Sequence, residues 1–485
     1  MVANRGEIAV RVMRTARRLG IATVAVYSDA DEKSLHAACA DEAYRVGPAP
    51  SSESYLRGDI IIETAKRCGA DAIHPGFGFL SENPAFCRAV NDAGLVFVGP
   101  SPEAMELMGG KLSAKAAVKA YGVPLAPGGD EPVRDPAVAR SLAETIGFPV
   151  MLKASAGGGG KGMRIVENAD DFDAMLAMAR SEAQSAFGDD AVFVEKYIAQ
   201  PRHVEIQILA DTFGNVTHLF ERECSIQRRH QKLVEEAPAA WMDDELRQKM
   251  GAAAVNVARA AKYTGAGTVE FLVDGQKNFY FLEMNARIQV EHPVTEMITG
   301  VDIVEEQLRV ADGQSLSFRQ DDLKIHGHAI ELRVCAEDPA NHFLPDVGTL
   351  ELFRPPRGKG IRVDSGVREG DDVAVYYDPM LAKLIVWGAD RNAALRAMTR
   401  AIDKFVVSGV KTTLDFGRFV MTHPNFISGQ FDTGFVARHF RPELLKREAT
   451  AAEAVAAAAA AVEFSPQALK PLPPKPLNPW RVRRG

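Results

Sequence analysis

The first hundred residues show apolar and polar positions arranged in alternating helix and strand patterns. Residues 7–19 carry a helical pattern, and short apolar stretches at residues 23–27, 72–74 and 96–98 are typical of strands. Strands that alternate with helices indicate a parallel sheet with crossover connections. Ligands bind at the carboxyl ends of such strands. The sequence has Asn-Arg-Gly-Glu at residues 4–7 and a glycine-containing segment at residues 74–83 at two of these ends.

A small module is expected between residues 126 and 197, after a helical connector that begins near residue 108 and reaches residue 121. Apolar strands at residues 148–153 and 163–166 flank a stretch with five glycines in six residues, 157–162. Two strands joined in this way predict a hairpin lid, whose backbone N–H groups can close over phosphates. The stretch is not a P-loop, because no Gly-Lys-Ser/Thr follows at the required spacing.

The longest part of the chain follows from residue 198, and strands alternating polar and apolar positions dominate it. Residues 201–209 alternate and predict a half-buried strand, and residues 326–337 alternate again around Arg333. An apolar strand is expected at residues 384–387. Residues 223–232 are dense in hydrogen-bond donors. Such a run is most often a solvated charged face, but beside a nucleotide site we favour contact with phosphates.

A hairpin near residue 274 carries candidate metal ligands. Glu270 lies in an apolar strand, residues 278–282 form another, and Asp274-Gly275 between them favours a tight turn. This turn would place Glu270 and Glu283 side by side. Asn285 shares the parity of Glu283, so both side chains point to one face of an extended chain. Oxygen ligands of this kind suit Mg²⁺. A hydrated hairpin face is the alternative, disfavoured because unpaired charges among apolar residues are costly.

A second site follows directly along the chain. Arg287 can hold an oxyanion in a bidentate fork, and Glu291 can act as a general base four residues later. Metal-binding acids, an anion clamp and a base together indicate phosphoryl transfer onto a small oxyanion.

Composition narrows the functional classes. The chain has 485 residues, 46% hydrophobic and 25% charged, and a net charge of −7. These values are ordinary for a soluble protein of several domains and do not suggest a nucleic-acid partner. No apolar run reaches the roughly 18 residues of a membrane span. Five cysteines without metal-ligand spacing argue against a disulfide framework and for the reducing cytoplasm.

The segment Glu-Met-Asn-Ala-Arg-Ile-Gln-Val-Glu-His-Pro-Val-Thr-Glu, residues 283–296, strongly resembles the signature of biotin carboxylases, members of the ATP-grasp superfamily. The resemblance runs from about residue 3 to residue 440. It implies an α/β fold (α+β overall) of ATP-grasp architecture. We expect a Rossmann-like parallel-sheet domain at 1–108, a helical connector at 109–125, a mobile lid domain at 126–197, a mixed α/β catalytic domain at 198–445 and an Ala/Pro-rich tail at 446–485.

The resemblance also implies a role for each site residue. Glu270, Glu283 and Asn285 would bind Mg²⁺ or Mn²⁺. Bicarbonate would be held by Lys232, Arg287, Gln289 and Val290, and Glu291 would deprotonate it. Arg333 would stabilise the enolate of biotin. The ATP-binding residues would be Lys111, Lys153, Gly157, Gly158, Gly159, Gly160, Glu195, Lys196, Tyr197, Ile198, His203, Gln227 and His230.

The implied reaction is carboxylation of biotin N1 through carboxyphosphate, formed from ATP and bicarbonate. It would be the first half-reaction of an acyl-CoA carboxylase, with acetyl-CoA or propionyl-CoA as the leading acceptors. The implied partners are a biotin carboxyl carrier protein, carboxyltransferase subunits and a second copy of the chain. The alternatives are another ATP-grasp ligase, such as a carbamoyl-phosphate or purine-pathway enzyme, and a non-catalytic scaffold subunit.

The chain departs from the family pattern in two places, and it lacks the motif of a biotin carrier. Phe77 stands where biotin carboxylases usually have Tyr, which removes a hydroxyl. Only Met1 and Val2 precede the Ala-Asn-Arg-Gly-Glu motif, and we expect a truncated or misassigned start. The sequence contains no Ala-Met-Lys-Met, the usual setting of a biotinylated lysine. We therefore expect biotin to arrive on another polypeptide.

Overall fold

The computed structural model describes residues 1–129, 131–155 and 163–445. Its N-terminal part is the predicted parallel array. β1 pairs with β2 and β3 with β4, both in parallel, and Val2 bridges Ala25 and His74 to join the two pairs. The elements are α1 (Gly6–Arg18), β1 (Val24–Ser28), α2 (Leu35–Cys39), β2 (Glu42–Gly47), α3 (Gly58–Arg67), β3 (Ala72–Ile73), α4 (Pro84–Asp92) and β4 (Val96–Phe97).

A three-stranded antiparallel sheet, in the order β6-β5-β7, follows the helical connector. Its β5–β6 pair runs to Lys153 opposite Met163, which confirms the predicted hairpin. The glycines expected in the lid lie outside the described residues. The elements are α5 (Pro102–Gly109), α6 (Lys111–Ala120), α7 (Pro136–Ile146), β5 (Val150–Ala154), β6 (Met163–Val166), α8 (Phe172–Phe187) and β7 (Val192–Lys196).

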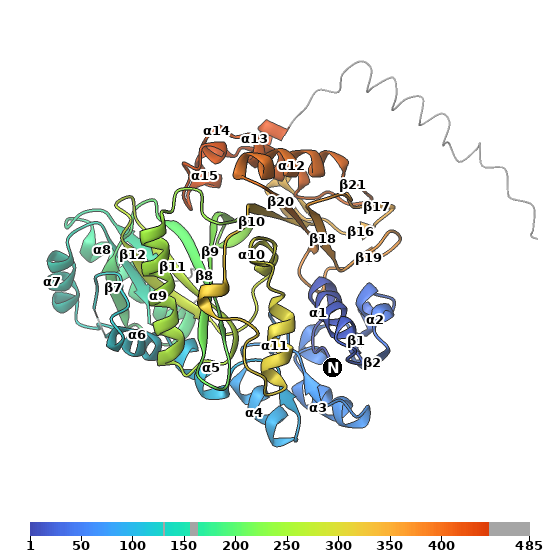
Figure 1. Ribbon diagram of the computed structural model, residues 1–485. Helices are drawn as coiled ribbons and strands as arrows, with labels where there is room; N and C mark the ends of the chain where they lie inside the picture. Colours follow the sequence, from blue (N-terminus) through green and yellow to red (C-terminus); the bar gives the residue numbers. More distant parts are fainter. Residues whose placement is uncertain (130, 156–162, 446–485) are drawn as a thin grey trace, which may run out of the picture. The chain divides into compact units, whose positions relative to one another are not determined.

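The framework of the remaining chain is an eight-stranded antiparallel sheet, in the order β12-β11-β8-β9-β10-β13-β20-β18. Helix α9 (Asp244–Ala260) lies along β8 and β9, and α12 (Arg391–Lys404) packs on β13 and β20 (Figure 1). The strands are β8 (Arg202–Ala210), β9 (Val216–Arg228), β10 (Gln231–Ala237), β11 (Gly265–Val273), β12 (Phe279–Asn285), β13 (His328–Cys335), β18 (Ile361–Ser365) and β20 (Met380–Gly388).

Shorter elements complete this part of the fold. Helix α10 begins directly after Glu291 and packs on β9, β10, β13 and β20. The elements are α10 (His292–Thr299), α11 (Ile303–Ala311), β14 (Glu337–Asp338), β15 (Leu344–Pro345), β16 (Gly348–Thr349), β17 (Leu352–Arg354), β19 (Asp372–Val373), β21 (Val406–Ser408), α13 (Leu414–Thr422), α14 (Pro424–Ile427) and α15 (Phe435–His439).

The prediction that the strand at residues 201–209 is half-buried is wrong. All of β8 after its first residue is buried, including Glu205 and Gln207, which are 0% exposed. Their side chains meet the guanidinium of Arg222, which donates to both. Polar residues on one face of a strand therefore do not mark a solvated face here, because that face meets other polar side chains inside the protein.

The donor-rich segment at residues 223–232 is not a solvated charged face either. It forms the end of β9, a turn and the start of β10, and Glu223 and Ser225 within it are buried. Arg229 and His230 form the turn with positive φ angles of 50° and 69°. The hairpin thus directs its tip, and not its whole length, toward solvent.

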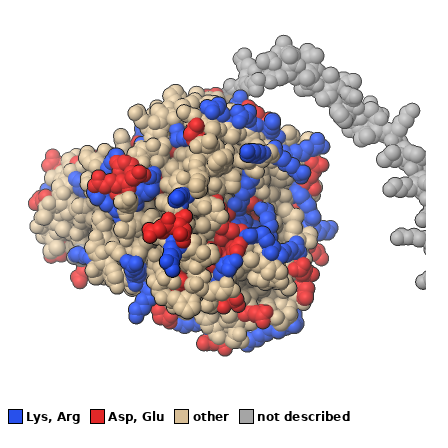
Figure 2. Space-filling model, viewed as in Figure 1, with Lys and Arg blue, Asp and Glu red and all other residues tan. Residues whose placement is uncertain are grey.

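Residues Met1–Phe440 form one compact unit. The predicted alanine-rich and proline-rich tail segments, from residue 446 onward, lie outside the described residues. On the face shown in Figure 2, acidic and basic side chains are interspersed. None of the helices in the described ranges has the length and hydropathy that a bilayer-spanning helix needs.

Candidate functional site

A cleft of about 1390 Å³ gathers side chains from the N-terminal array, the three-stranded sheet and the eight-stranded sheet. Most residues that the sequence marked as candidates line it, although they come from positions 153 to 333. Those candidates are Lys153, Glu195, Lys196, Tyr197, Ile198, His203, Gln227, His230, Lys232, Glu270, Glu283, Asn285, Arg287, Gln289, Val290 and Arg333. The side chain of Lys111 and the glycines Gly157, Gly158, Gly159 and Gly160 lie outside the description.

The two candidate metal-binding acids are cross-strand neighbours, as expected, although a β-bulge rather than the turn alone places them opposite each other. Glu270 on β11 pairs with Glu283 on β12, next to a β-bulge. The Asn285 amide donates to Glu270 at 2.9 Å. Partial burial and the nearby Glu270 carboxylate raise the pKa of Glu283. Two carboxylates and an amide at a cleft wall form an oxygen-rich donor set that fits Mg²⁺ or Mn²⁺.

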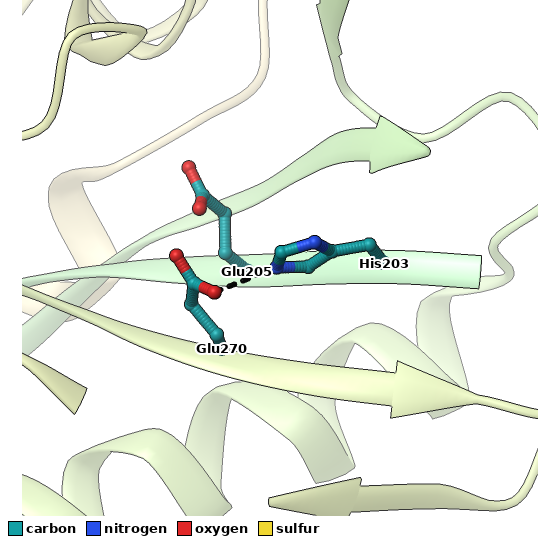
Figure 3. Close-up of side chains that lie close together, drawn as sticks. All are labelled: His203, Glu205 and Glu270. Atoms are coloured by element: carbon teal, nitrogen blue, oxygen red, sulfur yellow. Dashed lines mark hydrogen bonds and ion pairs between the residues drawn. The ribbon is translucent and has the colours of Figure 1, made fainter. Parts of the chain in front are cut away.

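His203 and Glu205 on β8 join Glu270 in a compact group (Figure 3). The ring Nε2 of His203 lies 2.8 Å from Glu270 Oε2, and Glu205 sits directly across from Glu270 in the strand register. Burial opposes ionisation of Glu270, but Lys232 and His203 outweigh it and lower its pKa. Glu270 is therefore held as an anion, which is the state a metal ligand requires.

Lys232 is the central cation of the site. Its ammonium donates to Glu205 at 2.5 Å, to Glu270 at 2.8 Å and to Glu291 at 2.7 Å. Although burial opposes its charge, these carboxylates raise the pKa of Lys232 well above its usual range. The lysine thus links the candidate metal ligand Glu270 to the candidate base Glu291.

Glu291 lies behind the cleft wall rather than on it, with 0% exposure. Lys232 contacts its Oε1, and Arg333 donates to its Oε2 at 2.9 Å. Burial favours the protonated form, but the two cations outweigh it and hold the pKa of Glu291 well below its usual range. The carboxylate is therefore ionised at neutral pH, ready to accept a proton from a molecule bound beside Lys232.

Arg333, which lies on β13, bridges two buried carboxylates. Its Nε donates to Glu235 at 2.7 Å while its Nη2 contacts Glu291. Burial raises the pKa of Glu235 to about 7, against the opposing charge of Arg333. Glu235 did not stand out in the sequence, because its partner lies 98 residues away.

The pKa of Glu235 predicts a measurable pH dependence of stability. Its folded-state value of about 7 exceeds the ordinary 4.5, so the folded protein binds more protons between these values and loses stability as pH rises through them. Glu235→Gln removes this titration while keeping an acceptor for Arg333. We expect the stability of the variant relative to the parent to rise from about pH 4.5 to about pH 7. Urea unfolding at several pH values measures this; a pH-independent difference contradicts it.

Arg287 is oriented by a residue of the N-terminal array. Glu82, in the predicted glycine-containing segment, accepts from Arg287 Nε at 2.8 Å and from the Ala286 N–H at 2.9 Å. Arg287 also donates to Asn285 at 2.9 Å and to Gln289 at 3.0 Å. These contacts fix the plane of the guanidinium beside the candidate metal ligands.

Glu82→Ala should weaken anion binding at this site. Loss of the carboxylate frees the guanidinium to rotate, so we expect the KM for bicarbonate, the anion that the resemblance implies, to rise about three- to tenfold, the scale of one charge-assisted hydrogen bond at a partly exposed site. Glu82→Gln retains one acceptor and should show a smaller rise. Steady-state kinetics with varied bicarbonate test this. A KM for bicarbonate equal to that of the parent in both variants contradicts it.

The part of the cleft that holds the candidate nucleotide contacts contains Glu195 between two lysines. Lys153 on β5 donates to Glu195 on β7 at 2.5 Å, and Lys115 on α6 contacts the other carboxylate oxygen. Lys196 instead donates to the carbonyls of Gly147 and Phe148 at 2.8 and 3.1 Å. Lys115, which sequence reasoning missed, also lies 5.3 Å from the centre of the Phe193 ring. Its only sequence signal is its position one helical turn after Lys111.

Three more residues of the site were missed because nothing local marks them: Glu205, Arg222 and Glu82. Arg222 is 0% exposed and donates to Glu205, Gln207, Thr268 and Thr295. A charged residue in a strand of alternating polar and apolar positions is predicted to face solvent. Its burial can therefore be recognised only once the packing of the sheet is known.

Comparison with protein-family profiles gives three matches that together cover most of the chain. Residues 1–105 match "Biotin carboxylase, N-terminal domain", and residues 331–438 match "Biotin carboxylase C-terminal domain". Residues 110–319 match "Carbamoyl-phosphate synthase L chain, ATP binding domain".

Curated relatives include both short and long chains. A biotin carboxylase from Halalkalibacterium halodurans is 51% identical over 441 residues, which span 91% of this chain and 97% of that protein. The α subunit of methylcrotonoyl-CoA carboxylase from Dictyostelium discoideum is 52% identical over 93% of this chain. The match spans only 64% of the Dictyostelium protein.

Solved structures resemble the fold closely. A biotin carboxylase from Campylobacter jejuni superposes with a TM-score of 0.86 at 48% identity, covering 90% of this chain and 98% of that one. The biotin carboxylase domain of the Hydrogenobacter thermophilus 2-oxoglutarate carboxylase, in complex with MgADP, ADP and bicarbonate, gives a TM-score of 0.85 at 46% identity and covers 92% of this chain and 98% of that one.

Proposed function

This chain belongs to the biotin carboxylase family, whose members are ATP-dependent ligases, and we propose from this that it carboxylates N1 of biotin with ATP and bicarbonate. The observation that carries the proposal is the position of Glu291, a buried carboxylate whose two oxygens are held by Lys232 and Arg333. Lys232 holds the oxygen of Glu291 on the side where we place bicarbonate, and Arg333 holds the oxygen on the side where we place biotin.

In the first step, Glu291 removes the proton from bicarbonate. The bicarbonate is held beside Glu291 by Lys232, Arg287, Gln289 and Val290. The deprotonated anion, whose proton is now on Glu291, then attacks the γ-phosphoryl group of ATP, giving carboxyphosphate and ADP. Lys153 lies at the nucleotide end of the cleft, where a cation offsets the charge of the phosphates. Positioning and electrostatics supply most of the catalysis in such transfers.

Glu270, Glu283 and Asn285 are the residues that would hold Mg²⁺ or Mn²⁺. When bound, the metal would neutralise charge at the ATP phosphates. His203 and Lys232 keep Glu270 ionised, so its carboxylate is available as a ligand. The remaining nucleotide contacts are proposed for Glu195, Lys196, Tyr197, Ile198, Gln227 and His230, all of which line the cleft.

In the second step, carboxyphosphate releases CO₂ and phosphate, and the phosphate takes the proton from biotin N1. The resulting enolate attacks CO₂. Arg333 provides the fixed cation beside the developing negative charge, because its guanidinium lines the cleft and is held in place by Glu235 and Glu291.

We propose the partners and the acyl acceptor from family likeness. We expect a biotin carrier and a carboxyltransferase as partners, and a homodimer, since the similar Hydrogenobacter thermophilus domain is described as a dimer. Acetyl-CoA and propionyl-CoA are our leading acceptors. The relatives named for methylcrotonoyl-CoA and propionyl-CoA carboxylation are 49–52% identical to this chain, so identity alone does not separate these acceptors.

The competing function is that of another ATP-grasp ligase. The carbamoyl-phosphate synthase match covers residues 110–319, which include both the proposed nucleotide contacts and the proposed bicarbonate contacts. Arg333, proposed to stabilise the biotin enolate, lies in the part that matches biotin carboxylase. ADP formation measured with and without bicarbonate and biotin separates the two. We expect ADP formation to require bicarbonate and to be stimulated by biotin. Stimulation by ammonia in place of biotin supports the competing function instead.

A further inference from the structure

Lys383 is a fully buried lysine that the mechanism above does not use. It lies on β20 directly across from Arg333 of β13, and on its other side it faces Asp364 of β18. Its side chain is 0% exposed. Burying an ammonium group is costly unless it is paired and hydrogen-bonded. The contacts of Lys383 therefore indicate what its burial achieves.

The Lys383 ammonium donates to the backbone carbonyl of Val290 at 2.8 Å. It also lies 3.1 Å from Glu7 Oε1. Glu7 ends the Asn-Arg-Gly-Glu turn at the start of α1, and its carboxylate oxygens are buried without a hydrogen bond. Glu7 therefore pairs with the Lys383 ammonium by charge, whereas the hydrogen bond of that ammonium goes to the carbonyl of Val290.

Val290 is the central residue of the segment proposed to hold bicarbonate. Because a peptide group is planar, fixing the carbonyl of Val290 also fixes the N–H of Glu291 and the direction in which Glu291 leaves the turn. The preceding carbonyl is fixed in the same way, since His292 Nδ1 donates to Gln289 O at 2.8 Å. Two buried side chains therefore hold two successive carbonyls of this turn.

We propose that Lys383 is a positioning residue for the bicarbonate site, braced by Glu7 from the N-terminal array. The proposal rests on the proposed function, because it assigns bicarbonate to the Gln289–Val290–Glu291 turn. Lys383 does not touch the anion. It acts through the Val290 carbonyl, and its loss lets the turn rotate so that the base and the anion contacts lose their common geometry.

The test compares Lys383→Met with Arg391→Met. Both remove a cation that lies mostly inside the protein, pairs with a glutamate and donates to at least one backbone carbonyl, since Arg391 contacts Glu236 and the carbonyls of Phe426 and Ile427. Arg391 does not line the cleft. We expect the KM for bicarbonate to rise at least about tenfold in Lys383→Met, the scale of a hydrogen bond from a charged donor. The KM for ATP should stay within about twofold. Arg391→Met should leave both constants unchanged.

Several outcomes overturn the inference. One is a KM for bicarbonate in Lys383→Met within about twofold of the parent value; another is an equal rise in the KM for ATP. If Lys383→Met does not fold, Lys383→Arg and Glu7→Gln decide the matter, and unchanged bicarbonate constants in both variants overturn the inference. Failure of the proposed function is distinguishable, because the parent protein would then show no bicarbonate-dependent ATP cleavage.

Discussion

Glu291→Gln reduces the rate of bicarbonate-dependent ATP cleavage by about 10²–10⁴-fold, the usual contribution of a positioned general base. The substitution keeps the size of the side chain and one carbonyl oxygen but removes the proton acceptor. Glu291 is buried and does not line the cleft, so ATP should still bind. The expected result is therefore a fall in kcat with little change in the KM for ATP.

The measurement is ADP release at saturating ATP with varied bicarbonate. Because Lys232 and Arg333 hold the pKa of Glu291 well below its usual range, the base is ionised at neutral pH and the comparison is made there. A turnover number equal to that of the parent contradicts the assignment of Glu291 as the base. A rise in the KM for ATP alone would assign Glu291 to nucleotide binding.

Arg333→Ala should reduce biotin carboxylation by about 10²–10³-fold, which is typical when one group stabilising a developing negative charge is removed. It should reduce biotin-independent ATP cleavage by a smaller factor, because the biotin enolate forms only after carboxyphosphate. Some loss in that reaction is also expected, since Arg333 holds Oε2 of Glu291.

The matched control for this variant is Arg391→Ala. Glu235 and Glu236 are neighbours on β10, and each is held by one of the two arginines. Removing either arginine takes an ion-pair partner from a buried glutamate, although Glu236 keeps its contact with His328, so both variants should lose stability. Only Arg333→Ala should alter the ratio of carboxylation to ATP cleavage. Equal losses in the two reactions would assign Arg333 to ATP or bicarbonate.

The parts of the site that could be predicted from sequence are those with local geometry. The proximity of Glu270 and Glu283 follows from a short hairpin. Their direct pairing does not, because the turn alone would place Leu282 opposite Glu270, and a β-bulge between Glu270 and Phe271 brings Glu283 there instead. The β5–β6 hairpin follows in the same way from two apolar strands around a glycine run. The parallel N-terminal array follows from alternating strands and helices.

The parts that could not be predicted depend on contacts between distant segments. Glu205 and Gln207 alternate with apolar residues and therefore resemble the outer face of a half-buried strand. They are buried because Arg222, on the next strand, satisfies them inside the sheet. Glu82 contacts Arg287 across 205 positions of sequence, and no local pattern reports such a pair. The family signature was enough to predict where the site lies. The partner of each side chain could be identified only from the packing of segments that are distant in sequence.

The most direct test of the central claim is transfer of labelled bicarbonate to biotin by the purified protein with ATP and Mg²⁺. The account predicts label in biotin together with ADP and phosphate, and loss of that label in both Glu291→Gln and Arg333→Ala. ATP cleavage that proceeds without bicarbonate and leaves biotin unlabelled would contradict it.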